Sequence, residues 1–144
     1  MRRTLVLLAA FAFVVAACGG GTGATPAGGT GSVQLASVGT HGQILVGSNG
    51  KTLYAFTPDV GQATPTCNAT CAATWPPLTG AATAGIGIDQ AKLTTVTRAD
   101  GSSQLKYGDY PLYFYAPDTA AGQATGQGIG GNWFVIKADG TIIQ

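Results

Sequence analysis

The chain has 144 residues, including 23 glycines and no glutamate, and a formal net charge of +1. This length predicts one domain at most, and the missing glutamate argues against a helical protein, because helices draw heavily on Glu, Lys, Leu and Arg. Without Arg2 and Arg3, which lie in a segment that we expect to be removed, five cations face six aspartates. That balance argues against nucleic acid as a partner.

The first 17 residues have the pattern of a signal peptide. A basic start at residues 1–3 precedes an apolar run at 5–16, which is too short to span a bilayer comfortably but suits the core of a signal peptide. The run ends Val-Ala-Ala-Cys at Cys18, which resembles the lipobox of bacterial lipoprotein precursors and implies cleavage before Cys18 and acylation of its thiol. We therefore expect a lipid anchor on the extracytoplasmic face of the cell membrane, at the cell surface or in the periplasm. Ordinary secretion, which would leave Cys18 as a spare thiol, is the alternative.

Residues 18–32 read as a tether and residues 33–144 as the folded domain. Half of the stretch from 19 to 32 is glycine, and it contains no charged or bulky side chain. Such a segment buries too little apolar area to order itself.

Alternating and β-branched patterns predict about eight short antiparallel strands after residue 33. Three dipeptides, Asn49-Gly50, Asp100-Gly101 and Asp139-Gly140, each separate two such runs. We expect tight hairpins there, in which both turn residues take positive φ. The only helical expectation is a single turn within residues 69–74, before two prolines.

The chain also repeats itself with an offset of about 60 residues. Residues 53–59 match 112–118, the letters Gly-Gln-Ala-Thr recur at 61–64 and 122–125, and a tryptophan follows each time. Two copies are too few for a solenoid. We expect an all-β fold made of two pseudo-symmetric β units that share one core.

The repeated residues also carry a family resemblance. They are Tyr54, Phe56 and Asp59 in the first copy, Tyr113, Tyr115 and Asp118 in the second, with Cys67, Cys71, Trp75 and Trp133 nearby. This pattern resembles a bacterial family of secreted repeats, or predicted lipoproteins, with a Yx(FWY)xxD motif. The resemblance implies an envelope location and a duplicated β fold, and it supplies no assigned function.

The aromatic and acidic motif residues each allow two interpretations. The tyrosines, Phe56 and the tryptophans could line a ligand surface, or they could form aromatic core pairs with hydroxyls at the rim. Asp59 and Asp118 could accept local backbone N–H groups, or they could meet near the pseudo-symmetry axis and bind a cation such as calcium. We favour the structural interpretation in both cases.

Cys67 and Cys71 allow a structural and a functional interpretation. Outside the cytoplasm, two nearby cysteines usually form a disulfide. Because thiolates select Cu(I), the same pair with His41 could instead handle copper or transfer electrons. His41 is the only histidine, and nothing in the sequence brings it to the cysteines.

We therefore expect a non-enzymatic binding or structural module with no cofactor, anchored in the lipid bilayer through Cys18 and acting on an envelope partner that the sequence does not identify. A copper-handling or electron-transfer lipoprotein is the alternative. Hydrolase chemistry has little support, because the G-x-S-x-G nucleophile motif is missing.

Overall fold

A computed structural model describes residues 32–80 and 83–144, which form a nearly all-β domain. The predicted signal peptide, Cys18 and most of the tether lie outside these residues. The strands are β1 (Gln34–Ser37), β2 (Gln43–Val46), β3 (Tyr54–Phe56), β4 (Leu93–Thr97), β5 (Ser103–Tyr107), β6 (Tyr110–Tyr113) and β7 (Trp133–Val135), and a short α-helix, α1, spans Thr70–Thr74. Short 3-10 turns occupy Gly39–His41, Thr57–Asp59, Gln90–Lys92 and Ile129–Gly131. The predictions of an all-β fold and of an internal duplication are confirmed, with seven strands where about eight were expected.

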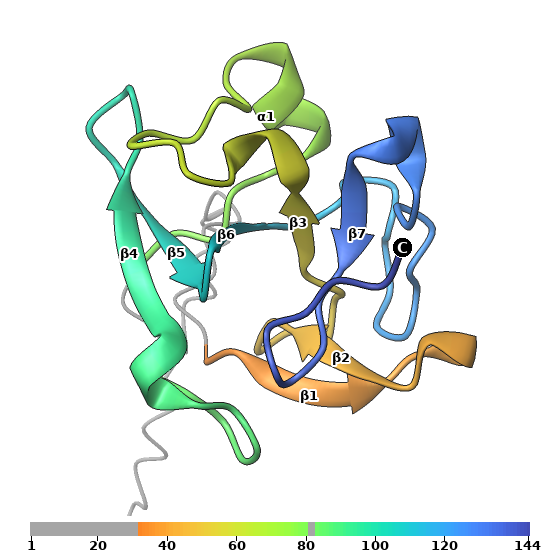
Figure 1. Ribbon diagram of the computed structural model, residues 1–144. Coiled ribbons are helices and arrows are strands. Elements are labelled where there is room, and N and C mark those ends of the chain that lie inside the picture. Colours follow the sequence, from red (N-terminus) through yellow and green to blue (C-terminus); the bar gives the residue numbers. More distant parts are fainter. Residues whose placement is uncertain (1–31, 81–82) are drawn as a thin grey trace, which may run out of the picture.

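Five strands form one antiparallel sheet in the order β4-β5-β6-β3-β7, and β1 and β2 form a separate hairpin. Figure 1 shows this hairpin running across one end of the larger sheet. The segment after β7 joins the two, because Ile44 bridges Lys137 and the N–H of Leu45 donates to the carbonyl of Ile136 over 2.8 Å. The hairpin thus extends the β structure beyond β7.

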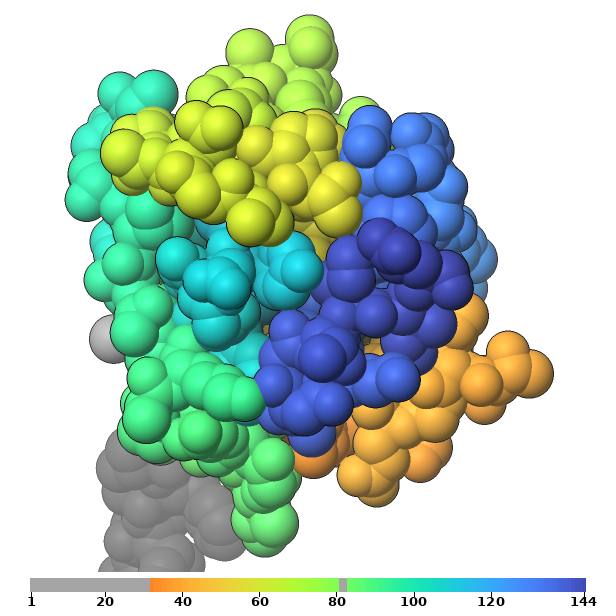
Figure 2. Space-filling view, in the orientation of Figure 1, coloured from red at the N-terminus to blue at the C-terminus, as the bar shows by residue number. Residues whose placement is uncertain are grey.

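Each repeat contributes one extended segment to the other repeat. Residues 76–79 of the first repeat reach β6 and β5 of the second, through bridges from Pro77 to Tyr113 and from Thr79 to Gln104. In return, β7 and the residues after it pair with β3 and β2 of the first repeat. At the centre β3 pairs with β6, where Tyr54 lies directly opposite Tyr113. In the space-filling view, the yellow segment after β3 lies against blue atoms of the second repeat, so the two repeats are in contact on this face (Figure 2).

The hairpins lie where the three dipeptides predicted them, but the expected turn geometry is wrong. Only the glycines, Gly50, Gly101 and Gly140, take positive φ. The residue before each glycine instead uses its side-chain Oδ1 to accept the N–H two positions on, at distances of 2.8–3.0 Å. The glycine N–H also donates to the carbonyl three residues back. This is the three-residue hairpin loop in which glycine alone needs the left-handed region.

The central strands are buried on both faces. Successive side chains of a strand point to opposite faces. Leu53, immediately before β3, and Leu112 of β6 accordingly enter an aliphatic cluster, while Tyr54 and Tyr113 enter a second, mainly aromatic cluster. All four side chains are fully buried. The repeated motif therefore lies in the interior of the domain, at the junction of the two repeats.

Candidate functional site

The tyrosine of each motif bonds to the aspartate of the other motif. The hydroxyl of Tyr54 donates to Oδ2 of Asp118 over 2.5 Å, and the hydroxyl of Tyr113 donates to Oδ2 of Asp59 over 2.6 Å. Both aspartates are buried, at 2 % and 1 % exposure for Asp59 and Asp118. We call these two pairs the crossed clasp, because each bond ties one repeat to the other.

The second oxygen of each aspartate is bonded within its own repeat. Oδ1 of Asp59 accepts the backbone N–H of Thr66 over 2.7 Å and the hydroxyl of Thr66 over 2.6 Å. Asp118 holds Thr125 in the same way. Each carboxylate thus has three donors from the chain itself. Neither threonine was predicted from the sequence as part of the motif.

The pseudo-symmetry also corrects the alignment of the two repeats. Thr66 and Thr125 lie 59 positions apart, as do Tyr54 and Tyr113. The repeated letters Gly-Gln-Ala-Thr suggested that Thr125 corresponds to Thr64, and this match is out of register by two residues. The signal that could have found Thr66 was the constant spacing of seven residues after each motif aspartate.

The environment of the clasp keeps both phenols protonated. Burial, and after it the hydrogen bond to Asp118, raises the pKa of Tyr54 well above its usual value. Burial and the bond to Asp59 raise the pKa of Tyr113 in the same way. Both hydroxyls therefore act as hydrogen-bond donors at neutral pH, and the arrangement favours a structural role over general-base chemistry.

Four aromatic rings form a continuous stack beside the clasp, in the order Phe56, Trp133, Trp75, Tyr115. The ring centroids are 4.2, 3.8 and 4.3 Å apart along this series, and the two indoles are parallel. Rings from the first and second repeats alternate, because the chain crosses between the repeats next to each tryptophan and so places Trp75 against Tyr115 and Trp133 against Phe56. Tyr54 and Tyr113 meet Trp75 and Trp133 edge-on, at 5.4 and 5.2 Å.

The stack leaves little aromatic surface for a ligand. Trp75 and Trp133 are each 5 % exposed, whereas Phe56 and Tyr115 at the two ends are half-buried. The indole faces are covered by other rings of the stack. A ligand would reach only the ends of the stack and the edges of the indoles.

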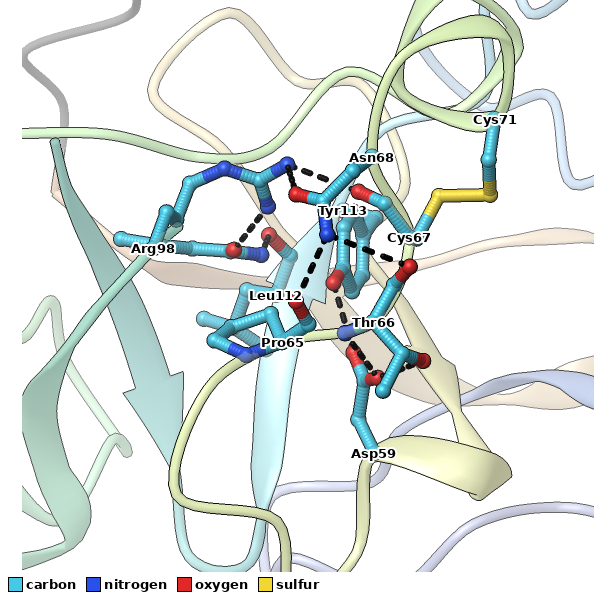
Figure 3. The surroundings of a disulfide bond; sticks show 10 residues. Asp59, Pro65, Thr66, Cys67, Asn68, Cys71, Arg98, Leu112 and Tyr113 are labelled. Carbon is cyan, nitrogen blue, oxygen red and sulfur yellow. Dashed lines mark hydrogen bonds between the residues drawn. A yellow bond between two sulfur atoms is a disulfide. The ribbon is translucent and has the colours of Figure 1, made fainter. Parts of the chain in front are cut away.

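Cys67 and Cys71 form a disulfide, as the structural interpretation predicted. Beside it lies a buried cation that the sequence analysis missed, Arg98 at the end of β4, which is 4 % exposed. Its guanidinium donates to the carbonyl of Cys67 over 2.7 Å, to Oδ1 of Asn68 over 3.0 Å and to Oε1 of Gln104 over 2.6 Å. Figure 3 shows Arg98 approaching the Cys67 carbonyl and the Asn68 side chain from one side, with the disulfide on the other. No sequence pattern marked an arginine at a hairpin end as an interior residue.

The alternative metal sites gain no support from the arrangement. His41 lies in a 3-10 turn, and residues 32–80 and 83–144 contain no group of three His, Cys, Asp or Glu side chains placed to hold a metal ion. Both oxygens of Asp59 and of Asp118 already accept hydrogen bonds within the chain. Copper binding through Cys67, Cys71 and His41 would require the disulfide to be reduced first.

The duplicated geometry agrees with a comparison to known families. The sequence pattern of a family described as a secreted repeat of unknown function matches residues 35–79 and again residues 94–137. The chain belongs to this secreted-repeat family. Each match ends with the segment that crosses to the other repeat, so one family unit is one half of an intertwined pair. The family description supports a location outside the cytoplasm.

No curated protein and no solved structure matches the chain significantly. Within the part of the chain that the structure describes, none of the helices is long and apolar enough to cross a membrane.

Proposed function

We propose that this protein is a lipid-anchored extracytoplasmic module that acts by binding or by structure and not by catalysis. The observation that carries the proposal is that the polar atoms of the motif side chains are already hydrogen-bonded within the chain. Asp59 and Asp118 each accept three hydrogen bonds, and the two tyrosines that bond to them are fully buried. Side chains that are buried and hydrogen-bonded in this way stabilise a scaffold and are not free to act on a substrate.

The anchor in this proposal is an acylated Cys18 in the outer face of the membrane. The family description of a secreted repeat supports export of the chain. The first residues that the structure describes agree with a tether that ends near residue 32, because Val33 is fully buried and its carbonyl accepts the N–H of Gly85 over 2.8 Å. The envelope partner would be met by the outer surface of the domain, since the motif lies inside it.

Carboxamide variants of the two aspartates test the structural role. A residue kept for binding or catalysis commonly costs stability, so its replacement is neutral or stabilising. A residue of the scaffold behaves in the opposite way. We expect Asp59→Asn and Asp118→Asn each to lower the free energy of unfolding by about 1.5–3 kcal/mol, the usual contribution of a hydrogen bond to a charged group.

The matched control is Asp109→Asn, because Asp109 is exposed. It should leave the urea midpoint within experimental error of the parent. If Asp59→Asn and Asp118→Asn were as stable as this control, or more so, the motif would be a site held for a ligand and the proposal would be wrong.

Anchoring is tested by labelling cells with an alkyne analogue of palmitate. The parent and a Cys67→Ser/Cys71→Ser double variant should both incorporate the label and remain with the membrane fraction. Cys18→Ser should lose the label and leave that fraction. A Cys18→Ser protein that stays membrane-bound would contradict the lipid anchor.

A further inference from the structure

The disulfide breaks the symmetry of the two repeats. The offset of 59 positions places Gly126 and Gly130 opposite Cys67 and Cys71. The second repeat nevertheless holds Asp118 and Thr125 as the first holds Asp59 and Thr66, and it supplies its tryptophan to the stack. A disulfide is therefore not required to build this half of the fold, and its presence in one repeat calls for another explanation.

The five-residue ring closed by the disulfide contains an unfavourable backbone conformation. Ala69 has φ 49° and ψ −119°, and it is the only residue other than glycine with positive φ in residues 32–80 and 83–144. A side chain with a Cβ atom adopts this conformation only when its surroundings impose it. Here the residue lies between the two bonded cysteines, immediately before α1. Opening the disulfide removes the ring closure and allows Ala69 to relax.

The surroundings of the two sulfur atoms also favour exchange with a thiol. Cys71 is half-buried, whereas Cys67 is 1 % exposed. An attacking thiolate therefore reaches the Cys71 sulfur more easily, and Cys67 becomes the leaving group. The guanidinium of Arg98 donates to the carbonyl of Cys67 and to the side-chain oxygen of Asn68, so the backbone at Cys67 stays held in place while Cys71 is attacked.

We propose that Cys67–Cys71 is a redox-active disulfide that accepts two electrons from the dithiol of an extracytoplasmic thiol–disulfide oxidoreductase. In the first step a thiolate of the donor forms a bond to Cys71 Sγ, the Cys67–Cys71 bond breaks, and Cys67 leaves as a thiolate that takes up a proton. The second thiol of the donor then attacks the mixed disulfide. Cys71 is released and takes up the second proton, and the donor becomes the oxidised disulfide.

Reduction would act on the aromatic stack through α1. The backbone N–H of Trp75, which follows the helix, donates to the carbonyl of Cys71 over 2.7 Å. The carbonyl of Thr74 accepts the N–H of Ala116 from the second repeat over 2.9 Å. Loosening this turn changes the support of Trp75, so the fluorescence of the indole pair reports the state of the disulfide.

The experiment uses the exported chain carrying Cys18→Ser, so that Cys67 and Cys71 are the only thiols. The protein is equilibrated in buffers of reduced and oxidised glutathione, the free thiols are trapped with a maleimide, and the reduced fraction is measured by intact mass. Circular dichroism and tryptophan fluorescence are recorded on the same samples. We expect glutathione to reduce the disulfide while the domain stays folded, with a change in tryptophan fluorescence. If reduction requires urea at a concentration that unfolds the domain, the disulfide is purely structural and the proposal is overturned.

Two glycine variants test the role of Ala69. Ala69→Gly removes the backbone conflict of the oxidised form, so it should shift the exchange equilibrium toward the disulfide by about tenfold, or about 30 mV. Ala73→Gly makes the same chemical change inside α1, where the backbone is helical, and should not favour the disulfide. Equal behaviour of the two variants would overturn the argument. A Cys67→Ser/Cys71→Ser variant should show no fluorescence response to glutathione.

Discussion

Replacing Tyr113 with phenylalanine removes one oxygen atom and leaves a buried carboxylate with one donor fewer. Asp59 is 2 % exposed, and its Oδ2 accepts the Tyr113 hydroxyl. The loss of a hydrogen bond to a charged group costs about 1.5–3 kcal/mol. Tyr54→Phe should cost about 1 kcal/mol more, because the Tyr54 hydroxyl also accepts the N–H of Gly126 over 3.2 Å.

These free energies are large enough to measure by urea unfolding at pH 7. For a domain of about 100 residues, 1 kcal/mol corresponds to roughly 4 °C in Tm, so Tyr113→Phe should lower Tm by about 6–12 °C. Tyr110→Phe is the matched control, because Tyr110 is only half-buried and lies outside the clasp. It should change Tm by much less than either clasp variant.

A pair of double-mutant cycles tests whether Tyr54 is coupled to the aspartate of its own motif or to that of the other repeat. The crossed pair, Tyr54→Phe with Asp118→Asn, should show a coupling free energy of about 1 kcal/mol or more, because the two side chains are bonded. The pair within one motif, Tyr54→Phe with Asp59→Asn, should be closer to additive. A larger coupling within the motif than across the repeats would refute the crossed clasp.

Three further results are expected from the same geometry. The free energy of unfolding should fall above about pH 10 by about 1.4 kcal/mol per pH unit for each of Tyr54 and Tyr113. The reason is that both phenols ionise in the unfolded chain, whereas their raised pKa keeps them protonated in the folded one. Urea midpoints between pH 9 and 11 measure this slope, and each Tyr→Phe variant should reduce it. Gly126→Ala should cost about 1–3 kcal/mol, since a Cβ there would lie 2.9 Å from the rings of Trp75 and Tyr54; a urea midpoint equal to the parent would contradict this close packing. Residues 32–88 and 89–144, made separately, should be unfolded as monomers and fold when mixed, and a dispersed NMR spectrum from either half as a monomer would show that the repeats are not interdependent.

The sequence determined the local features of this protein. Its glycine-rich composition and alternating patterns predicted an all-β domain, and the three dipeptides ending in Gly50, Gly101 and Gly140 marked its hairpins. Two cysteines four positions apart predicted the disulfide. These features depend on neighbouring residues, so a linear pattern contains them. The turn geometry was wrong because the side-chain acceptor before each glycine makes a second positive φ unnecessary.

Only the tertiary structure decided how the repeats combine. A duplicated motif has the same letters whether Tyr54 bonds to Asp59 of its own copy or to Asp118 of the other. The choice follows from the exchange of extended segments between the repeats, which depends on contacts more than 50 residues apart in the chain. The same exchange alternates the aromatic rings of the stack. The sequence did not reveal the burial of Arg98 either, because its partners are the carbonyl of Cys67, the side chain of Asn68 and the side chain of Gln104 on the next strand. Side-chain type predicts what a residue can bond to, whereas the path of the chain decides which partner lies within reach.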